Sequence, residues 1–478
     1  MFTRRDFLKT AALTTAGIAA GEMNMRAQSV PQSAESIKRV NGAGKKINLA
    51  CIGIGNRGEQ VISEWENTGL ANIVALCDVD MGGPQTLKVM GKYPKARQFK
   101  DYREMFDKMA NEIEAVAVVV PDFSHFPAVM LSMSYGKHVF VEKPMARTFL
   151  EAELMMKAAR KYKNLVTQVG NQGHSDANYY QFKAWKEAGI IKDVTAITAH
   201  MNSARRWHDF DPKMVRPLDK QPIPSTLDWD LWHGTVPYHE YNALYHQGNW
   251  RCWYDFGMGA LGDWGAHILD TAHEFLKLDL PTVVDPIRMD GHTDYFFPMA
   301  STILFHFPKR SGMPACDVTW YDGVNNLPPL PKGYGVSELD PSIPAAGGNS
   351  LQPSSLNPGK IIYGKDLTFK GGTHGSTLSI IPAEKAKEMA SKLPEVPKNG
   401  SNHYSNFLLS CMGEEKTRSS FETFGPMSQV FSLGVMAQRL NTRIEFDPET
   451  KTITNNAFAN AMLTGIPPRS GWEQYYKI

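Results

Sequence analysis

Three residues of this chain have the types and the spacing that proton transfer needs. Asp263 and His267 are four residues apart in a segment with helical spacing, so both side chains should lie on one helix face. A neutral imidazole that works near its ordinary pKa suits a general base, and a carboxylate beside it can orient substrate hydroxyls. Lys143 follows an apolar, strand-like segment, and its ammonium can polarise a hydroxyl or ketone oxygen. The three residues predict alcohol oxidation, in which the hydroxyl loses its proton as hydride leaves the carbon.

The sequence leaves the division of labour among these residues open. Either Lys143 or His267 could carry the proton, because spacing does not separate the two. In a purely structural interpretation, Asp263 caps its helix, His267 is a satisfied interior histidine and Lys143 is a solvated loop residue. We expect instead that His267 is the base, that Lys143 lowers the effective pKa of the alcohol, and that Asp263 and His267 contact the substrate.

A glycine-rich turn earlier in the chain predicts where a cofactor lies. The strand-like segment KKINLACIGIG leads into the motif G-I-G-N-R-G, and a helical pattern follows. Glycines at these positions make the tight turn, let a pyrophosphate approach the backbone, and let helix and strand pack closely. The next apolar segment ends at Asp78, whose carboxylate can bond ribose hydroxyls and would repel a 2′-phosphate, so NAD is favoured over NADP. From these patterns, the residues predicted to bind the cofactor are Gly53, Gly55, Asn56, Arg57, Gly58, Asp78, Glu142 and Lys143.

Strand and helix patterns alternate between residues 45 and 170 and position these groups. Apolar runs such as AVAVVV and KHVFVE are separated by helical segments, which predicts a parallel sheet with right-handed crossovers. Lys143 then lies at the carboxyl end of a parallel strand. This is the edge at which doubly wound sheets bind their ligands.

The pattern changes from residue 171 onward. Alternating stretches such as DVTAITAHMN and STILFHF predict an antiparallel sheet, glycine and proline crowd residues 322–375 and predict long surface loops, and the last part has helical spacing. We predict a dinucleotide-binding domain at 45–170. For 171–478 we predict a substrate-binding α+β domain with a large, mostly antiparallel open sheet, whose C-terminal helices pack back on the first domain.

Polar-tipped side chains in the second domain are candidates for substrate contacts. Tryptophan and histidine are frequent between residues 200 and 273, and aromatic platforms with polar edges suit sugars, although most of these rings should be packing. His174 follows a predicted strand end, so we predict that it binds substrate. Arg205 and Arg206 either bind an acidic sugar or form a solvated surface pair.

The N-terminus resembles a twin-arginine export signal. Arg4 and Arg5 precede an alanine-rich apolar stretch that is too short for a stable membrane span. We predict an export signal at residues 1–30, a flexible lead-in at 31–44 and a periplasmic location, the alternative being a basic tail on a cytoplasmic protein. The cleavage site stays open. A periplasmic enzyme meets little free NAD, so it should hold its dinucleotide tightly.

Composition argues against several other classes of protein. Lys+Arg 51 against Asp+Glu 49 gives a net charge of +2, which implies no basic face for nucleic acid. Five cysteines form no C-x-x-C pair, and the histidines show no metal-binding spacing. We therefore expect no metal, no nucleic acid and no disulfide framework.

Two longer motifs resemble the Gfo/Idh/MocA family of sugar and cyclitol oxidoreductases, which includes glucose-fructose oxidoreductase and inositol dehydrogenase. The first is VVVPDFSHFPAVMLSMSYGKHVFVEKPMA, with its Glu142-Lys143-Pro144 tripeptide; the second is the glycine-rich approach to Asp263-x-x-x-His267. The resemblance, which we place in an exported Bacteroidetes-type branch, implies a Rossmann domain. It adds Pro121 and His125 to the cofactor-binding residues. It also implies a homo-oligomer, because family members commonly associate through the open sheet.

The resemblance implies an NAD(P)-dependent oxidoreductase that acts on a secondary hydroxyl of a sugar, cyclitol or glycoside. One alternative is an NAD-retaining glycoside hydrolase that works by transient oxidation and elimination, as in the family's N-acetylgalactosaminidase branch. The D-x-x-x-H arrangement looks more like the dehydrogenase branches. A second alternative is a non-catalytic sugar-binding protein on the same fold. The substrate and the oxidised carbon stay open.

Overall fold

A parallel sheet of six strands forms the first half of the protein. The computed structural model describes residues 44, 46–203, 205, 207, 210–214, 218–246, 248–310, 312–324, 326–334 and 357–478. The predicted export signal at 1–30, residues 31–43 of the predicted lead-in, and Arg206 lie outside the described residues. The strand order is β3-β2-β1-β4-β5-β6, and every neighbouring pair is parallel. This is the doubly wound sheet that the strand and helix alternation predicts.

The strands of this sheet are short and apolar. Their bounds are β1 Ile47–Ile52, β2 Ala71–Cys77, β3 Arg97–Phe99, β4 Ala115–Val118, β5 His138–Val141 and β6 Thr167–Val169. Strands β4 and β5 are buried at every position, as expected for strands covered by helices on both faces. The helices are α2 Arg57–Asn67, α3 Pro84–Lys92, α4 Tyr102–Met109, α5 His125–Ser134 and α6 Phe149–Lys161.

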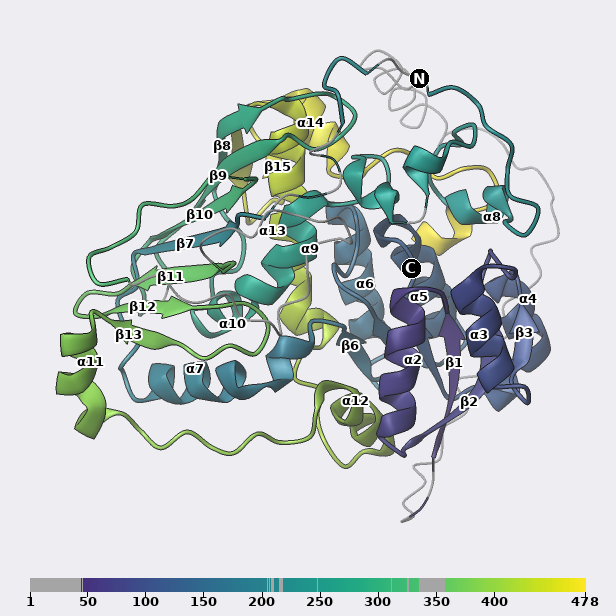
Figure 1. The fold of residues 1–478 in the computed structure, drawn as a ribbon, viewed down its shortest axis with the longest axis horizontal. Coiled ribbons are helices and arrows are strands. Elements are labelled where there is room, and N and C mark those ends of the chain that lie inside the picture. The colour runs from purple at the N-terminus through teal and green to yellow at the C-terminus, as the bar shows by residue number, and fades with distance from the viewer. Residues whose placement is uncertain are drawn as a thin grey trace.

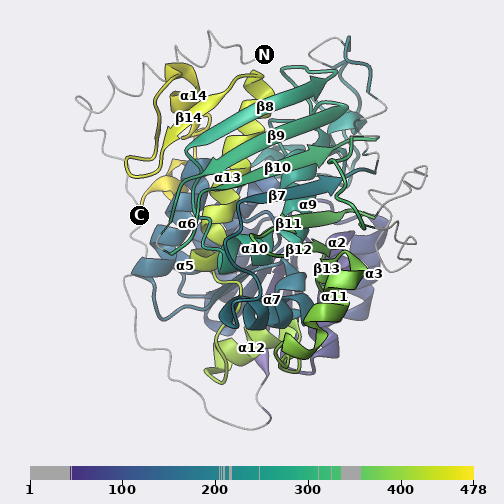
Figure 2. The ribbon, with the colours of Figure 1, turned by 90° about the vertical axis from the view of Figure 1, so that its left-hand side faces the viewer.

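A second sheet of nine strands forms the other half, with the order β13-β12-β11-β7-β10-β9-β8-β14-β15. Only the β7–β10 pair is parallel among its described pairings, so the sheet is mostly antiparallel. Figure 2 shows one broad face of it turned to the viewer, without a covering layer of helices over its central strands. Its strands are β7 Ala196–Met201, β8 Val283–Asp290, β9 Ala300–Phe307, β10 Cys316–Asp322, β11 Gly359–Tyr363, β12 Thr368–Gly371, β13 Ser379–Ile381, β14 Ile444–Asp447 and β15 Thr452–Ile453.

The prediction of long loops over residues 322–375 was wrong in part. Strands β11 and β12 lie in this segment and pair with each other, and β11 also pairs with β7. Both strands are short. A Cβ added to Gly359 or to Gly371 would lie within 2.6 Å of backbone or side-chain atoms of the neighbouring chain segment. Glycine here permits close strand contact, although in the sequence it indicates a turn.

The helices of the second half are α7 Ala177–Glu187, α8 Trp229–His233, α9 Gly259–Ile268, α10 Asp270–Phe275, α11 Ala383–Met389, α12 His403–Met412, α13 Phe421–Leu440 and α14 Ala457–Met462. Of these, α9, α10 and α13 lie between the two sheets (Figure 1). Helix α13 packs against α6 of the first half and against α9 and β8 of the second (Figure 1). Helix α12 packs on α2 and β1. The C-terminal helices therefore do pack back on the parallel-sheet half.

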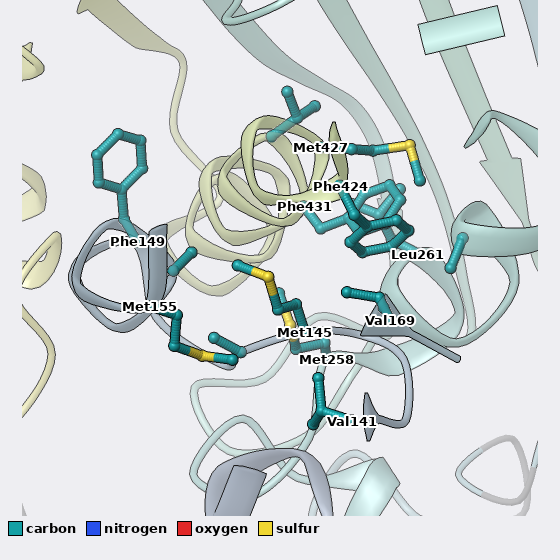
Figure 3. Close-up of a cluster of buried hydrophobic side chains, with 14 of the residues drawn as sticks. Val141, Met145, Phe149, Met155, Val169, Met258, Leu261, Phe424, Met427 and Phe431 are labelled. Atoms are coloured by element: carbon teal, nitrogen blue, oxygen red, sulfur yellow. The ribbon is translucent and has the colours of Figure 1, made fainter. Parts of the chain in front are cut away.

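One continuous apolar core joins the two halves beneath the residues that could do chemistry. Figure 3 shows methionines and phenylalanines of α6 and α13 meeting the ends of β5 and β6 and the beginning of α9. The labelled contributors include Val141, Met145, Val169, Met258, Leu261 and Phe431. Met145 comes two residues after Lys143 and Met258 five residues before Asp263, so this packing fixes the two chemical segments relative to each other.

Candidate active site

The carboxyl ends of the parallel strands bring the predicted cofactor residues to one edge. Ile52 is in register with Cys77 and Val118, and Val118 with Val141, so the segments that follow β1, β2, β4 and β5 begin side by side. The backbone N–H of Glu142 donates to the carbonyl of Val118 over 2.9 Å. The glycine turn, Asp78, Pro121 and the Glu142-Lys143-Pro144 tripeptide all lie along this edge.

The three glycines of the turn have different reasons to be glycine. Gly53 has a φ of +80°, and a Cβ there would lie 2.2 Å from the carbonyl oxygen of Val119; a Cβ at Gly58 would lie 2.2 Å from the carbonyl oxygen of Gly53. A Cβ at Gly55 would meet only Thr86 Oγ1 at 3.4 Å and Asp78 Oδ2 at 4.0 Å. The protein's own packing requires Gly53 and Gly58. Gly55 instead keeps the backbone open, as the approach of a dinucleotide pyrophosphate requires.

Asp78 supports this turn directly. Its Oδ2 accepts hydrogen bonds from the backbone N–H groups of Ile54 at 2.9 Å and Gly55 at 3.3 Å, and its Oδ1 accepts one from Asp80 at 3.0 Å. Burial raises the pKa of this carboxyl against the opposing effect of these bonds. The donor set of the turn and the acidic residue at the end of β2 fit a dinucleotide with an unphosphorylated ribose.

Arg57 joins the glycine turn to the tripeptide. Its Nε donates to Glu142 Oε1 over 3.0 Å, and its Nη2 donates to Tyr404 Oη of α12 over 3.1 Å. The Glu142 carboxylate raises the pKa of Arg57, so the guanidinium stays charged. Asn56, which precedes α2, is exposed and makes no capping hydrogen bond with its side chain. Of the predicted cofactor contacts, Arg57 and Glu142 thus already form one hydrogen-bonded unit.

His125 is buried behind this edge and holds two loops together. Its Nδ1 lies 2.8 Å from the carbonyl oxygen of Pro144 and its Nε2 lies 2.9 Å from that of Val120. Burial lowers its pKa to about 4, so the ring is neutral. Pro121 begins the turn between these contacts. His125 therefore holds the loops after β4 and β5 together. A direct contact of Pro121 or His125 with the cofactor stays a prediction.

Lys143 reaches across to the second half and meets Asp263. Its ammonium donates to Asp263 Oδ1 over 2.6 Å and to the Asp263 carbonyl oxygen over 3.0 Å. Asp263 is interior to α9, which begins at Gly259, so the carboxylate does not cap this helix. His267 follows one turn later, and both side chains are buried. The structure therefore brings Lys143, Asp263 and His267 together.

The charges around these residues favour an ionised aspartate and a neutral histidine. Burial opposes ionisation of Asp263, but the cations Arg251, Lys143 and Arg205 outweigh it and hold the pKa of this carboxyl well below its usual range. Burial and then the Lys143 ammonium lower the pKa of His267 far below its usual range. His267 Nδ1 is buried without a hydrogen-bond partner among the described residues. That nitrogen is available to a ligand.

A second imidazole, which the sequence did not reveal, covers His267. The ring of His374 stacks on that of His267 with centroids 4.1 Å apart and planes 15° apart, and the His374 backbone N–H donates to the His267 carbonyl over 3.0 Å. His374 lies between β12 and β13 in the segment G-G-T-H-G. Burial lowers its pKa to about 4. A histidine flanked by glycines was the available signal, but it lay in a segment predicted to be surface loop.

Two arginines also converge on Asp263. Arg205 is 4% exposed and contacts Asp263 Oδ2. The interpretation of this residue as half of a solvated pair is therefore wrong. Arg251 Nε lies 3.5 Å from Asp263 Oδ1, and its Nη2 lies 4.0 Å from Asp122 Oδ1. Asp122 follows β4, and burial raises its pKa to about 7. Arg251 was not singled out from the sequence, because no motif marks it and its meeting with Asp122 depends on the tertiary fold.

His174, predicted to bind substrate, lies in a separate buried ion-pair network. Its Nε2 is 2.5 Å from Glu274 Oε2 and its Nδ1 is 3.3 Å from Asp270 Oδ2. Burial opposes protonation, but the two carboxylates raise the pKa of this histidine to about 9. Both ring nitrogens are thus engaged by the protein itself. The structure brings together Lys143, Asp263 and His267, and leaves His174 occupied elsewhere.

Two further features bear on the kind of site. Across the described ranges, no group of three or more histidine, cysteine, aspartate or glutamate side chains has a metal-binding arrangement. Among the helices in the described part of the chain, none is long and apolar enough to cross a membrane.

Comparison with known proteins matches a segment of each half to the same family. Residues 47–170 match the Gfo/Idh/MocA model described as an oxidoreductase family with an NAD-binding Rossmann fold, and residues 182–295 match the model of its C-terminal alpha/beta domain. A glycosyl hydrolase family 109 protein of Shewanella pealeana is 30% identical over 181 residues, which are 34% of this chain and 38% of that protein. An inositol 2-dehydrogenase of Salmonella paratyphi B is 27% identical over 147 residues, which are 30% of this chain and 43% of that protein. Both matches thus span less than half of the relatives' length.

Solved structures with a similar fold extend over most of the chain. An aldose-aldose oxidoreductase from Caulobacter crescentus, solved with glycerol, is 16% identical with a TM-score of 0.52, over 84% of this chain and 100% of that one. The WlbA dehydrogenase from Bordetella pertussis, solved with NADH and UDP-GlcNAcA, is 14% identical with a TM-score of 0.55, over 84% and 99% of the two chains. At these identities the similarity concerns the fold alone.

Proposed function

We propose, because segments of both halves of the chain match models of the Gfo/Idh/MocA family of oxidoreductases, that this protein is an NAD-dependent oxidoreductase. It would move a hydride between a tightly held NAD and a secondary hydroxyl of a sugar, cyclitol or glycoside. The observation that carries the proposal is the chain of contacts from the glycine turn to the helix of the second half. Arg57 bonds Glu142, and the next residue, Lys143, bonds Asp263, one turn before the neutral His267.

Each residue of the site would have its own role in alcohol oxidation. NAD, when bound, supplies the hydride acceptor. Lys143 uses two of its three ammonium donors on Asp263 and keeps the third for a substrate oxygen. His267 is neutral, and its buried Nδ1 has no hydrogen-bond partner in the part of the chain that the structure describes, so it is in the protonation state that accepts a hydroxyl proton. Asp263 fixes Lys143 in place and stays ionised, because three cations surround it.

A panel of sugars tests this function. Purified full-length protein with NAD is mixed with sugars, cyclitols and glycosides, and the absorbance of reduced nicotinamide is followed. We expect reduction with at least one secondary alcohol of these classes. Dinucleotide binding without turnover of any of them would contradict the proposal and support a non-catalytic sugar-binding protein on this fold.

A glycoside hydrolase that works by transient oxidation and elimination is the second candidate, and His374 is the observation that favours it. This route removes a proton from a hydroxyl and another from carbon, and His374 places a second neutral imidazole, which can act as a base, against His267. Glycosyl hydrolase family 109 proteins are among the relatives. Aryl glycosides, supplied without added NAD, separate the two candidates. Aglycone release without net reduction of nicotinamide would favour the hydrolase.

We also propose that the protein is exported to the periplasm and that it forms a homo-oligomer. Arg4 and Arg5 before the short apolar stretch support export to the periplasm, and cell fractionation of the full chain tests it. The family and the broad face of the nine-stranded sheet support a homo-oligomer, which light scattering on the purified protein tests.

A further inference from the structure

Arg251 is a nearly buried guanidinium whose hydrogen-bonding capacity is unused. Its side chain is 19% exposed, and it makes no hydrogen bond to any residue in the described ranges; its Nε is buried without a partner. Its carboxylate neighbours are 3.5 Å and 4.0 Å away, beyond hydrogen-bonding distance for a charged pair. Buried polar groups are nearly always hydrogen-bonded, and a guanidinium carries five N–H donors.

Three of the four carboxylate oxygens around Arg251 already have another partner. Asp263 accepts from Lys143 and contacts Arg205 through its other oxygen. Asp122 Oδ2 accepts from the backbone N–H of Met258 over 3.1 Å. Asp122 Oδ1 is buried without a hydrogen-bond partner among the described residues, but it lies 4.0 Å from the guanidinium. Neither carboxylate therefore lies within hydrogen-bonding distance of Arg251.

Local packing holds Arg251 in this position. Its guanidinium lies over the ring of Trp250, 4.4 Å from the centroid. The backbone is pressed against the segment before α9, since a Cβ on Gly257 would lie 2.6 Å from the Cα of Arg251. A side chain fixed in this way loses little conformational entropy when it binds a ligand.

The ligand must come close to the proposed chemistry. Arg251 Nε and Lys143 Nζ both approach the same atom, Asp263 Oδ1, at 3.5 Å and 2.6 Å. A planar fork of donors matches the paired oxygens of a carboxylate or phosphate. We propose that the substrate is a sugar that carries an oxyanion, and that Arg251 binds this group beside the hydroxyl that reacts at Lys143. This inference rests on the proposed carbohydrate oxidoreductase function.

Matched pairs of anionic and neutral sugars test the proposal. The holoprotein is assayed with D-glucuronate and D-galacturonate, with D-glucose 6-phosphate, and with D-glucose and D-galactose, by nicotinamide absorbance. We expect kcat/KM for at least one anionic sugar to exceed that of its neutral counterpart by about 10- to 100-fold, the effect of one charged hydrogen-bonding contact. The uronates and the phosphate separate the two sources of the oxyanion.

Arg251→Gln should abolish this preference by raising KM for the anionic sugar. Arg439→Gln is the matched control, because Arg439 is 23% exposed and pairs with Asp255 at 3.2 Å, away from Lys143. It should leave the ratio unchanged even if it lowers stability. Equal kcat/KM for anionic and neutral sugars, or an equal loss for both in Arg251→Gln, would overturn the proposal while the oxidoreductase function stands.

Calorimetry on the holoprotein covers the case in which no sugar of either kind is oxidised. Binding of a uronate or sugar phosphate that Arg251→Gln removes and Arg439→Gln keeps would support the oxyanion site, although the oxidoreductase function had failed. The absence of binding by all the anionic sugars would overturn it.

Discussion

The cofactor edge and the substrate side of this site are built in opposite ways. On the cofactor edge, Gly53, Gly58 and Asp78 shape a backbone turn, and each follows or opposes the end of a parallel strand. On the substrate side, side chains from distant segments meet around Asp263. The first region depends on backbone conformation and the second on long-range ion pairs and ring contacts. Substitutions in the two regions should therefore alter different measured properties of the protein.

Replacing Lys143 should have the largest effect on turnover and little on the cofactor edge. Lys143→Met removes the ammonium that we propose polarises the substrate oxygen, so we expect kcat to fall by about 10³-fold or more. Dinucleotide affinity, measured by fluorescence titration, should fall much less than kcat. Lys163→Met, at an exposed lysine before β6, is the control and should behave as wild type. Normal turnover in Lys143→Met would show that the site is misassigned.

Paired glycine variants should separate folding from cofactor binding. Gly53→Ala places a methyl 2.2 Å from the Val119 carbonyl oxygen at a positive φ, so we expect a loss of more than about 2 kcal/mol of unfolding free energy. Gly55→Ala finds room among the protein's own atoms, so stability should stay within about 0.5 kcal/mol of wild type. Its dinucleotide affinity should nevertheless fall by about tenfold or more. Denaturant unfolding and NAD titration measure the two quantities, and unchanged affinity in Gly55→Ala would contradict the assignment of the turn.

Replacing His374 should damage the substrate side alone. His374→Asn removes the ring stacked on His267, and we expect kcat/KM to fall by about tenfold, with dinucleotide affinity unchanged. His306→Asn is the control, because His306 is half exposed on the nine-stranded sheet and pairs with Asp317. Equal activity in the two variants would remove His374 from the site.

The pH dependence of stability should report the His174 network. The folded-state pKa of His174 is raised to about 9 from an ordinary value near 6.5. Its stabilisation is therefore fully present below pH 6.5 and is lost as pH rises through about 9, by up to about 3 kcal/mol. Denaturant unfolding across this range should show the decrease in wild type. A His174→Gln variant with the same slope would indicate that other groups cause it.

Much of the cofactor edge could be predicted because its information is local. The glycine turn, Asp78 and the Glu142-Lys143-Pro144 tripeptide lie at strand ends, and the parallel sheet that aligns those ends follows from the alternation of strands and helices. The spacing of Asp263 and His267 likewise placed them on one helix. Their meeting with Lys143 followed from family resemblance.

Residues that depend on distant partners could not be predicted. His174 was expected to face the substrate because it follows a strand end, but its partners Asp270 and Glu274 lie 96 and 100 residues further along the chain. His374 acquires its position only when the β12–β13 turn meets α9, and Arg251 only when its segment meets both α9 and the loop after β4. The glycines that permit close packing of β11 and β12 also made the sequence of that segment resemble a loop.

The most direct test of the account is whether the glycine turn holds a dinucleotide. Native mass spectrometry of the intact, full-length protein, as purified and after incubation with millimolar NAD, measures this. We predict one dinucleotide per chain in wild type and a clear loss of occupancy in Gly55→Ala. Wild-type protein that binds no NAD or NADP under these conditions would contradict the proposed function.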